Sequence, residues 1–490
     1  MSIESVSMER CHLVPAQTTS RRSFLETVSG GLYGSALLSL LQSEQTPAAP
    51  QGELLQLTGE GESRTHHAPR AQAVIQLFMN GGPSQMDLFD PKPELDRQHG
   101  TPYFHKIAGE VEFPEAAGAL MRSPFEFKQH GQCGMWVSEA MPHLAQCVDD
   151  IAFIRSMHTT NLTHELALFK IHCGRMLPGL PSLGAWVTYG LGTENEDLPA
   201  YVVLDDPQGL PVNAIQSWQS GFLPPEHQGT RFRANGTPIL NLQREFSEPV
   251  TVTQAERAFI NEIDERHRRQ RSGQPRLAAR IASYRLAARM QLAATDALDL
   301  GQEDIQTQAM YGIGQGESDS YGRRCLIARR LVERGVRFVQ LYINGQIWDN
   351  HSNLKSGLES CCRRTDKPVA ALLQDLKQRG LLDTTLVCWG GEMGRLPIAQ
   401  LAAGGDGRDH NKNAFTLWMA GGGVKGGTVH GSTDDLGLAA VEDRVSVPDW
   451  HATILHLLGL DHEQLVFPRN GLEERLTGVF EPRVVREVLA

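Results

Sequence analysis

The chain has few cysteines for its length and no Cys-x-x-Cys pair. Eight cysteines are scattered over 490 residues, and the first of them, Cys11, lies in the N-terminal leader. This spacing excludes the dense disulfide scaffold of a small secreted domain. We expect most of the cysteines to be buried apolar side chains, although an oxidising compartment would allow one or two disulfides.

An excess of positive charge is also missing. The formal net charge is -11 and the pI is about 5.9. A general nucleic-acid binder needs a basic face to neutralise phosphates, so this composition argues against a nucleic-acid partner. The chain is 40% apolar and 21% charged, which is ordinary for a globular protein and excludes a disordered chain or a membrane bundle.

A long apolar run is absent too. The nearest approach to one is the uncharged segment 27–43, but its glycines and serines leave it short of the roughly 20 apolar residues that span a membrane. It follows Ser20-Arg-Arg-Ser-Phe-Leu25, and paired arginines in this position are typical of twin-arginine export. We therefore expect a signal peptide at 1–45, a flexible linker at 46–70, and a periplasmic or secreted mature protein without an integral membrane span.

Short apolar runs alternate with helical stretches from residue 73 onward. Such alternation predicts an α/β fold with a mainly parallel sheet covered by helices on both faces. Residues 71–480 are expected to form one large domain, with a helical insertion at about 250–300 where apolar residues recur at helical spacing. The expected strands are 74–79, 151–157, 201–204, 336–343, 384–389 and 414–420.

Polar residues follow three of these expected strands directly. The strand ends are Asn80-Gly-Gly-Pro-Ser84, Trp348-Asp-Asn-His351 and Gly391-Glu392. Buried parallel strands bring their C-terminal ends to one edge of the sheet, which is where open α/β sheets bind ligands. The sequence therefore predicts that one site is assembled from all three ends.

Several of these residues have the chemistry of metal ligands. Asp349 and His351 stand two residues apart, so both can face one cation if the chain there is extended. The alternative is that Asp349 caps the next helix and His351 only forms hydrogen bonds. Asp409, His410 and His430 lie in glycine-rich loops beside expected strands, where binding residues are common, but they could equally be ordinary loop residues.

The carboxylate of Glu392 needs a partner because it follows a buried strand. It can bind a cation, accept hydrogen bonds from loop amides, or form an ion pair with Arg395, and an unpaired state would be costly. Arg395 could also face a bound anion, so these roles are compatible.

The candidates for a catalytic nucleophile or proton carrier are Ser84, Thr160 and His164. Ser84 lies in a loop whose glycines allow close backbone approach to an anion, or merely make the turn. Thr160 and His164 lie where a helix is expected to open after the second strand. A threonine there can cap the helix, while the helix N-terminus can stabilise an oxyanion.

The ordered motifs resemble an uncharacterised, sulfatase-like family of exported bacterial proteins within the alkaline phosphatase and sulfatase superfamily. The resemblance extends from about Ala71 to Leu476. The motifs that carry it are Asn80-Gly-Gly-Pro-Ser-Gln-Met-Asp-Leu-Phe-Asp-Pro-Lys-Pro93, Pro178-Gly-Leu-Pro-Ser-Leu-Gly-Ala-Trp186, Trp348-Asp-Asn-His351, Gly391-Glu-Met-Gly-Arg395, Gly407-Arg-Asp-His-Asn411 and His430-Gly-Ser-Thr-Asp434.

The resemblance implies a three-layer α/β sandwich with a metal site at the C-terminal strand ends. The chain departs from the superfamily in two places. Glu392-Met393 stands where a sulfatase would have Asp-His, so one imidazole is missing unless His410 replaces it. Thr160-Asn-Leu-Thr-His164 stands where Cys/Ser-x-Pro-x-Arg would carry formylglycine, which excludes that chemistry there.

Two hypotheses follow. The first is an exported hydrolase of sulfate or phosphate esters, on small molecules or carbohydrates, that depends on a divalent metal ion such as zinc, calcium or manganese. The second is a non-catalytic, sulfatase-like protein that binds glycans or cell-envelope partners. In the first, the metal ligands would be Asp349, His351, Glu392, Asp409, His410 and His430, and the catalytic residues Ser84, Thr160, His164 and Arg395.

Overall fold

The structure is a computed structural model that describes residues 65–233, 249–271, 274–343 and 345–490. The predicted signal peptide and most of the predicted linker lie outside the described residues. Among the residues that are described, no helix combines the length and apolarity needed to cross a membrane.

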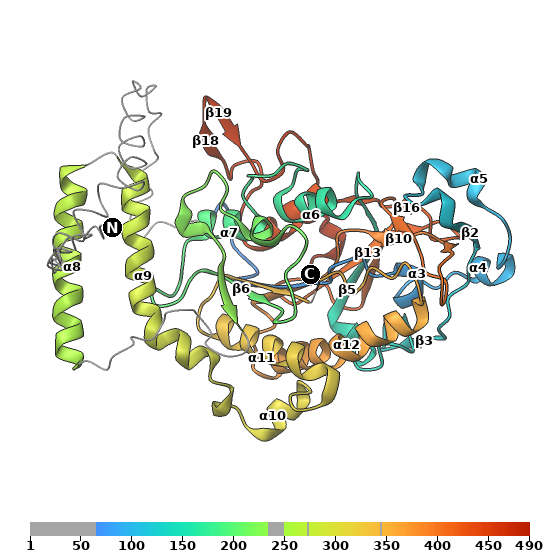
Figure 1. Cartoon of the computed structure of the whole chain (residues 1–490), viewed down its shortest axis with the longest axis horizontal. Helices are drawn as coiled ribbons and strands as arrows, with labels where there is room; N and C mark the ends of the chain where they lie inside the picture. Colours follow the sequence, from blue (N-terminus) through green and yellow to red (C-terminus); the bar gives the residue numbers. More distant parts are fainter. Residues whose placement is uncertain (1–64, 234–248, 272–273, 344) are drawn as a thin grey trace, which may run out of the picture. The chain divides into compact units, whose positions relative to one another are not determined.

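A large central sheet organises the fold (Figure 1). Its strands run in the order β14-β5-β13-β9-β1-β8-β6-β7, with the short β17 also paired to β5. Most neighbours are parallel, as predicted, and each of the six expected strands is present. The strands are β1 Ala73–Phe78, β5 Ile151–His158, β6 Tyr201–Asp205, β7 Thr230–Arg233, β8 Phe338–Tyr342, β9 Thr385–Gly390, β13 Phe415–Ala420, β14 Thr428–His430 and β17 Val445–Ser446.

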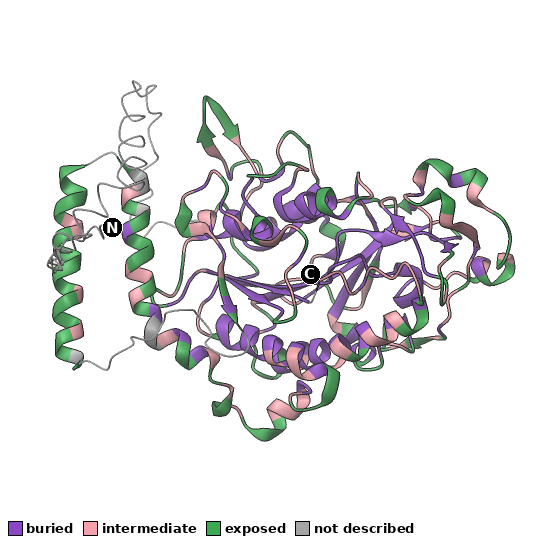
Figure 2. Ribbon diagram, viewed as in Figure 1, coloured by how far each residue is buried: buried purple, intermediate pink, exposed green. Residues whose placement is uncertain are grey.

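Two apolar cores cover the two faces of this sheet, because successive side chains of a strand point to opposite faces. Ile75 and Leu77 of β1 belong to one core, whereas Val74 and Phe78 belong to the other. Helices α11 (Asp319–Glu333) and α12 (Leu354–Gln378) pack on the first face. The second is covered by α6 (His164–Cys173), α7 (Leu183–Leu191) and α13 (Val447–Leu457). The predicted three-layer α/β sandwich is confirmed, and its buried middle layer is visible in Figure 2.

One strand runs against the others. β13 is antiparallel to both neighbours, β5 and β9. The residues that it brings to the C-terminal edge of the parallel strands are therefore those that precede it, at 409–412, and not those that follow it. This reversal explains how a loop before a strand joins loops that come after strands.

A third, smaller core lies beside this edge. It contains Met86, Ile107, Val111 and Leu396 and supports the segment 108–116. The elements around it are α3 Gln85–Leu88, α4 Pro93–Gln98, α5 Phe104–Ile107, β2 Ala117–Leu120, β10 Gly394–Arg395, β11 Ile398–Gln400 and β12 His410–Asn411. The remaining short strands are β3 Phe127–His130, β4 Met135–Ser138, β15 Ser432–Thr433, β16 Ala440–Glu442, β18 Phe467–Arg469 and β19 Leu472–Glu474.

In the region of the predicted helical insertion, the chain forms α8 (Val250–Gln270) and α9 (Pro275–Leu298). The C-terminal half of α9 joins the first core through Met290, Ala294 and Ala297. The helix α10 (Ile305–Met310) follows.

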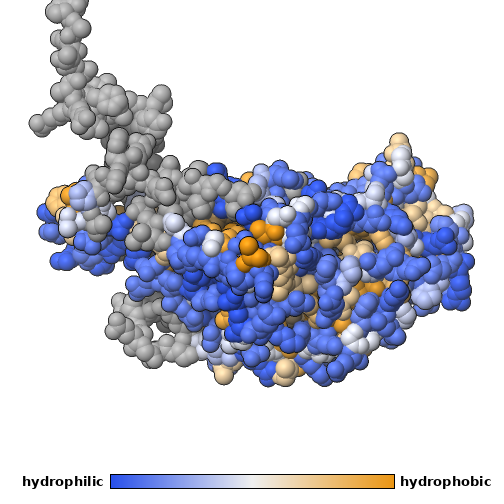
Figure 3. Space-filling view, turned by 90° about the horizontal axis from the view of Figure 1, so that it is seen from below, coloured by the Kyte–Doolittle hydropathy of each residue, from blue (hydrophilic) through white to orange (hydrophobic). Residues whose placement is uncertain are grey.

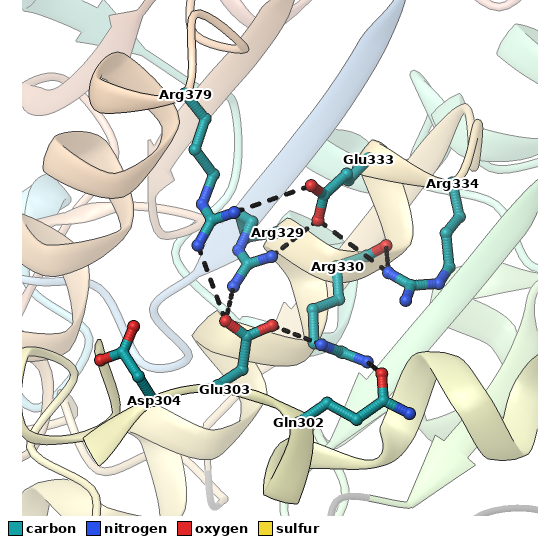
Figure 4. Close-up of a pocket in the computed structure, with 8 residues that line it drawn as sticks. All are labelled: Gln302, Glu303, Asp304, Arg329, Arg330, Glu333, Arg334 and Arg379. Atoms are coloured by element: carbon teal, nitrogen blue, oxygen red, sulfur yellow. Dashed lines mark hydrogen bonds and ion pairs between the residues drawn. The ribbon is translucent and has the colours of Figure 1, made fainter. Parts of the chain in front are cut away.

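A network of ion pairs fastens the segment after α9 to α11 and α12 (Figure 4). Glu303 pairs with Arg329 at 2.6 Å and also with Arg330, and the two arginines are only 1% and 3% exposed. Arg379 of the loop after α12 pairs with Asp375 at 2.6 Å. These guanidinium groups already form ion pairs with carboxylates of the chain. We therefore interpret the hollow that they line as a structural ion-pair network, here called the clasp, and not as a binding site for an anion.

All seven cysteines of the described part are free thiols. Six of them are buried, in agreement with the expectation that they act as apolar side chains. The disulfides that an oxidising compartment would allow are not formed among them.

Candidate metal centre

The turn after β1 is shaped by two glycines with positive φ. Gly81 and Gly82 have φ of 106° and 76°, and a Cβ on Gly81 would lie 2.6 Å from the backbone nitrogen of Asp349. The turn thus needs glycine both for its conformation and for close contact with the loop after β8. It presents the Gly81 N–H to the carboxylate of Glu392, which accepts at 3.0 and 3.2 Å. Glu392 is fully buried.

His164, the first residue of α6, joins the ends of β8 and β9. Its Nδ1 lies 2.7 Å from Glu392 Oε1, and its Nε2 lies 3.3 Å from Asp349 Oδ2. Since both oxygens of Glu392 already accept from the Gly81 N–H, the His164 Nδ1 donates the proton of this hydrogen bond. Nε2 is buried and has no properly oriented hydrogen-bond partner in the described structure.

Asp349 is the meeting point of the site. Its Oδ1 lies 2.8 Å from His351 Nε2 and 3.1 Å from His410 Nε2, and these two nitrogens are 3.0 Å apart. Arg395 donates to the same oxygen at 2.6 Å. Asp349 therefore faces three imidazoles, those of His164, His351 and His410, and each presents its Nε2.

The far nitrogens of the same imidazoles are held by acceptors. His351 Nδ1 hydrogen-bonds to the side-chain oxygen of Gln400, and His410 Nδ1 to the carboxylate of Glu112. Together with Glu392 on His164, each Nδ1 is thus a donor, and in a neutral ring this leaves the Nε2 lone pair free. A carboxylate or amide oxygen behind a histidine is the usual arrangement that orients a metal-ligating imidazole.

These residues fit a divalent cation. Four ligand atoms, one each from His164, Asp349, His351 and His410, lie within 4.8 Å of one another. Metal bonds of 2.0–2.1 Å in tetrahedral geometry place neighbouring ligand atoms about 3.3 Å apart, close to the 2.8–3.1 Å spacings around Asp349 Oδ1. The buried Nε2 of His164 has no well-oriented hydrogen bond, and such a cation would satisfy it.

The electrostatics of the cluster show how strongly it attracts positive charge. Burial alone would lower the pKa of His164, but the carboxylates of Asp349 and Glu392 outweigh it and raise that pKa to about 9. Burial likewise opposes ionisation of Asp349, yet its pKa is held far below the usual range by the three imidazoles and by Arg395. Without a metal ion, His164 is thus expected to be positively charged at neutral pH, with a proton on Nε2 as well as on Nδ1.

Arg395 holds the site together from within. It is 1% exposed and donates to the carbonyl oxygens of Gly82 at 2.9 Å and Arg408 at 3.1 Å, as well as to that of Gly81. Within the described part of the chain, Asp349 is the carboxylate with which it forms an ion pair. The ion pair with Glu392 that the sequence allowed is therefore not formed. In this structure Arg395 positions Asp349 and does not point toward an open anion site.

The other predicted site residues have different surroundings. Asp409 is buried and forms a second group of possible metal ligands with Glu112 and His410. It also accepts from the backbone N–H groups of Glu112 and Phe113 at 2.9 and 3.0 Å. Ser84 is 1% exposed and donates to Asp87, which forms a fully buried ion pair with Arg408 at 2.7 Å. These groups hold the loops that carry His410 and the glycine turn in place.

Thr160 and His430 are not brought into the cluster of ligand atoms. Thr160 is exposed, and its hydroxyl contacts Met176 Sδ at 3.6 Å. His430 ends β14, pairs in register with Ile154 in the middle of β5, and is three strands from β9. With strands about 4.8 Å apart, that is about 14 Å across the sheet.

Three residues of the site were not indicated by any sequence pattern, namely Glu112, Gln400 and Phe113. Glu112 and Phe113 lie in the segment supported by the third core, and the ring of Phe113 packs edge-on against His351 with centroids 5.3 Å apart. Neither their spacing nor a motif marks them. The only available signal was that Asp409 and His410 would each need a partner once buried.

A cation bound at His164 Nε2 must displace its proton, so the metal affinity of the site should depend on pH. Below the pKa of about 9, affinity should rise about tenfold for each pH unit, with release of one proton. Zinc-binding calorimetry at several pH values, in buffers of different ionisation enthalpy, measures both quantities. His164→Gln should flatten the slope; an equally steep slope in this variant would contradict the assignment.

The family model for "Protein of unknown function (DUF1501)" matches residues 71–489. No curated protein matches the chain. Among solved structures, the chain is similar to the PsFucS1 sulfatase from Pseudoalteromonas sp., with 12% identity, coverage of 86% of this chain and 72% of that one, and a TM-score of 0.38. It is also similar to a phosphonate monoester hydrolase from Silicibacter pomeroyi (10% identity, 86% and 76% coverage, TM-score 0.34). A third similar structure is the alkaline phosphatase of the Antarctic bacterium TAB5 (12% identity, coverage of 72% of this chain and 92% of that one, TM-score 0.29). Because the family model spans nearly the whole described domain, the chain belongs to the DUF1501 family.

Proposed function

We propose that the protein is an exported, metal-dependent hydrolase of sulfate or phosphate esters. The observation that carries the proposal is the convergence of three Nε2 atoms on the Asp349 carboxylate, each imidazole being held from behind by an acceptor. Three imidazoles and one carboxylate are a donor set that suits a divalent transition metal.

Of the three metals considered, the donor set favours zinc. Calcium takes six to eight oxygen ligands, whereas imidazole nitrogen suits zinc. A cation held here would supply Lewis-acid polarisation of an ester oxygen, which requires one coordination position beyond those taken by the protein ligands.

The residues of the chain would divide the remaining work. Glu392, Gln400 and Glu112 fix the ring orientations of His164, His351 and His410. Arg395 holds Asp349 from the interior. With Ser84 buried against Asp87 and Thr160 turned to Met176, we infer that water supplies the attacking oxygen and that no side-chain hydroxyl does.

The site is open on one side. The side chains of Asp349 and His351 are 20% and 26% exposed, and Phe113 beside them is 36% exposed. A small ester, or one end of a carbohydrate ester, could reach the cluster over this edge. The class of ester comes from the resemblance of the motifs, and export comes from the paired arginines near the N-terminus; neither rests on the described structure.

One observation favours the second hypothesis, a non-catalytic sulfatase-like protein that binds glycans or envelope partners. Met393 is fully buried against Gly82, at the position where the superfamily motif would offer an imidazole. If the substituted ligand set only binds a structural ion, the protein would hold metal without turnover.

Metal content and turnover measured on the same sample distinguish the hydrolase from the non-catalytic binding protein. Protein purified without chelator is analysed for bound metals and assayed with aryl phosphate and aryl sulfate, beside His410→Ala. The hydrolase is supported if the wild type binds about one divalent ion per chain and turns over an ester, and if His410→Ala loses both the metal and the turnover. Bound metal without turnover on either ester supports the binding protein, and folded wild type without metal refutes both versions of the site.

Glu112 should matter although it is not one of the four ligands. Replacing it by alanine removes the acceptor behind His410 Nδ1, and losses of this kind weaken metal binding by about 10–100-fold. Glu110→Ala is the matched control, because Glu110 lies two residues away and binds Lys412 and Asn413 instead. Equal metal affinities of the two variants in a competition titration would remove Glu112 from the account.

A further inference from the structure

The helix α8 is amphipathic, and it is oriented in an unexpected way. Val252, Phe259 and Ile263 lie within about 40° of one another around the helix axis and form a single stripe. Their side chains are 43%, 62% and 41% exposed. Figure 2 shows α8 exposed along nearly its whole length, and no described residue of it is buried.

The face that α8 turns toward α9 is polar. Arg285 of α9 donates to Asn261 at 3.1 Å and lies 3.9 Å from Glu265. Asn261 and Glu265 lie on the side of the helix opposite the stripe of Val252, Phe259 and Ile263. An ordinary surface helix does the reverse and buries its apolar stripe. The stripe of α8 thus faces away from α9.

Exposed apolar side chains grouped in this way mark an interaction surface. Hydrophobic surface is visible on the part of the molecule formed by α8 and α9 (Figure 3, left). The charges of α8 indicate what kind of partner fits. The helix carries four carboxylates and four arginines, so it lacks the cationic polar face of a helix that lies on an anionic membrane.

The order of these charges along α8 is complementary to itself. Glu256 and Glu262 flank the stripe in its first two thirds, and Arg266 flanks it near the C-terminal end. If two copies of α8 pair antiparallel about residue 261, Phe259 of each lies opposite Ile263 of the other. Glu256, which also interacts within its own chain, then lies opposite Arg266. The same pairing therefore matches apolar groups and opposite charges at once, as a two-fold interface requires.

We propose that the α8 stripe of Val252, Phe259 and Ile263 is the interface through which a second copy of this chain binds, with the two α8 helices antiparallel. The interface is independent of the metal centre. Three apolar side chains from each copy make a small core, so the dimer is of the weak, concentration-dependent class.

Sedimentation velocity over a wide range of protein concentration tests the interface. The wild type is expected to pass from monomer to dimer, and Phe259→Glu to shift that transition to at least about tenfold higher concentration. Tyr284→Glu is the matched control, since Tyr284 of α9 is 60% exposed and outside the stripe. A wild type that stays monomeric, including one that binds lipid vesicles instead, overturns the proposal. So does a dimer that Phe259→Glu leaves intact or that both variants weaken equally.

Charge reversal tests the antiparallel register. Glu256→Arg and Arg266→Glu should each weaken the dimer by placing like charges opposite one another. The double variant Glu256→Arg/Arg266→Glu should restore it, because both contacts across the two-fold axis are again between opposite charges. Failure of the double variant to recover would overturn the register.

Discussion

Asp349→Asn should release the metal ion and with it the hydrolytic activity. The amide keeps an oxygen that can accept from Arg395 Nη2, so the fold should survive. The substitution removes, however, the negative charge that balances the bound cation among three imidazole ligands. We expect bound metal to fall from about one ion per chain to less than about a tenth of that, and turnover of aryl esters to fall at least about 100-fold.

Asp406→Asn is the control for this variant. Asp406 is exposed in the loop before Arg408, so the substitution removes the same charge outside the cluster. It should retain metal and turnover. The comparison needs elemental analysis, steady-state kinetics and a thermal melt of both variants. If Asp349→Asn keeps its metal, Asp349 is not a ligand; if it unfolds while Asp406→Asn does not, Asp349 serves the fold through Arg395.

Glu303→Gln should cause the largest loss of stability, without touching the metal centre. Glu303 matches the charges of Arg329 and Arg330, which are almost completely buried (Figure 4). Arg329 would keep Glu333 and Asp375, but Arg330 would lose its carboxylate partner. Breaking a buried ion pair in this way costs about 3–5 kcal/mol of the free energy of unfolding. Urea denaturation followed by circular dichroism measures the change.

Asp304→Asn is the matched control on the same segment. Asp304 lines the same hollow but only caps α10, where it accepts from Thr307 N at 2.7 Å. Asparagine caps helices as well as aspartate, so the change should be less than about 0.5 kcal/mol. Similar midpoints for Glu303→Gln and wild type would show that the clasp contributes little.

The sequence was a good guide to the layers of the fold. β1, β6 and β9 were recognised because a parallel strand buried on both faces is a continuous apolar run. The direction of β13 could not be predicted in the same way, since an apolar run is equally apolar when it is reversed. Two-residue strands such as β10 and β12 are too short to produce any periodic signal.

The candidate site was predictable where the ligands stand next to an apolar strand in a short pattern. Asp349, His351 and His410 were named from such patterns, and the fold brings them together. His164 was named as a catalytic candidate, but the structure places it among the ligand atoms. His430 has a similar loop sequence and lies elsewhere, because the position of β14 in the sheet depends on contacts far apart in the chain. Glu112 meets His410 across 298 residues, and no local pattern encodes such a contact.

X-ray absorption at the edge of the bound metal tests the central claim most directly, because it reports ligand type and bond length at the cation itself. The account predicts nitrogen and oxygen ligands at about 2.0–2.1 Å, with outer-shell scattering from three imidazole rings. An all-oxygen shell at longer distance, or fewer imidazoles than two, would contradict a site made of His164, Asp349, His351 and His410.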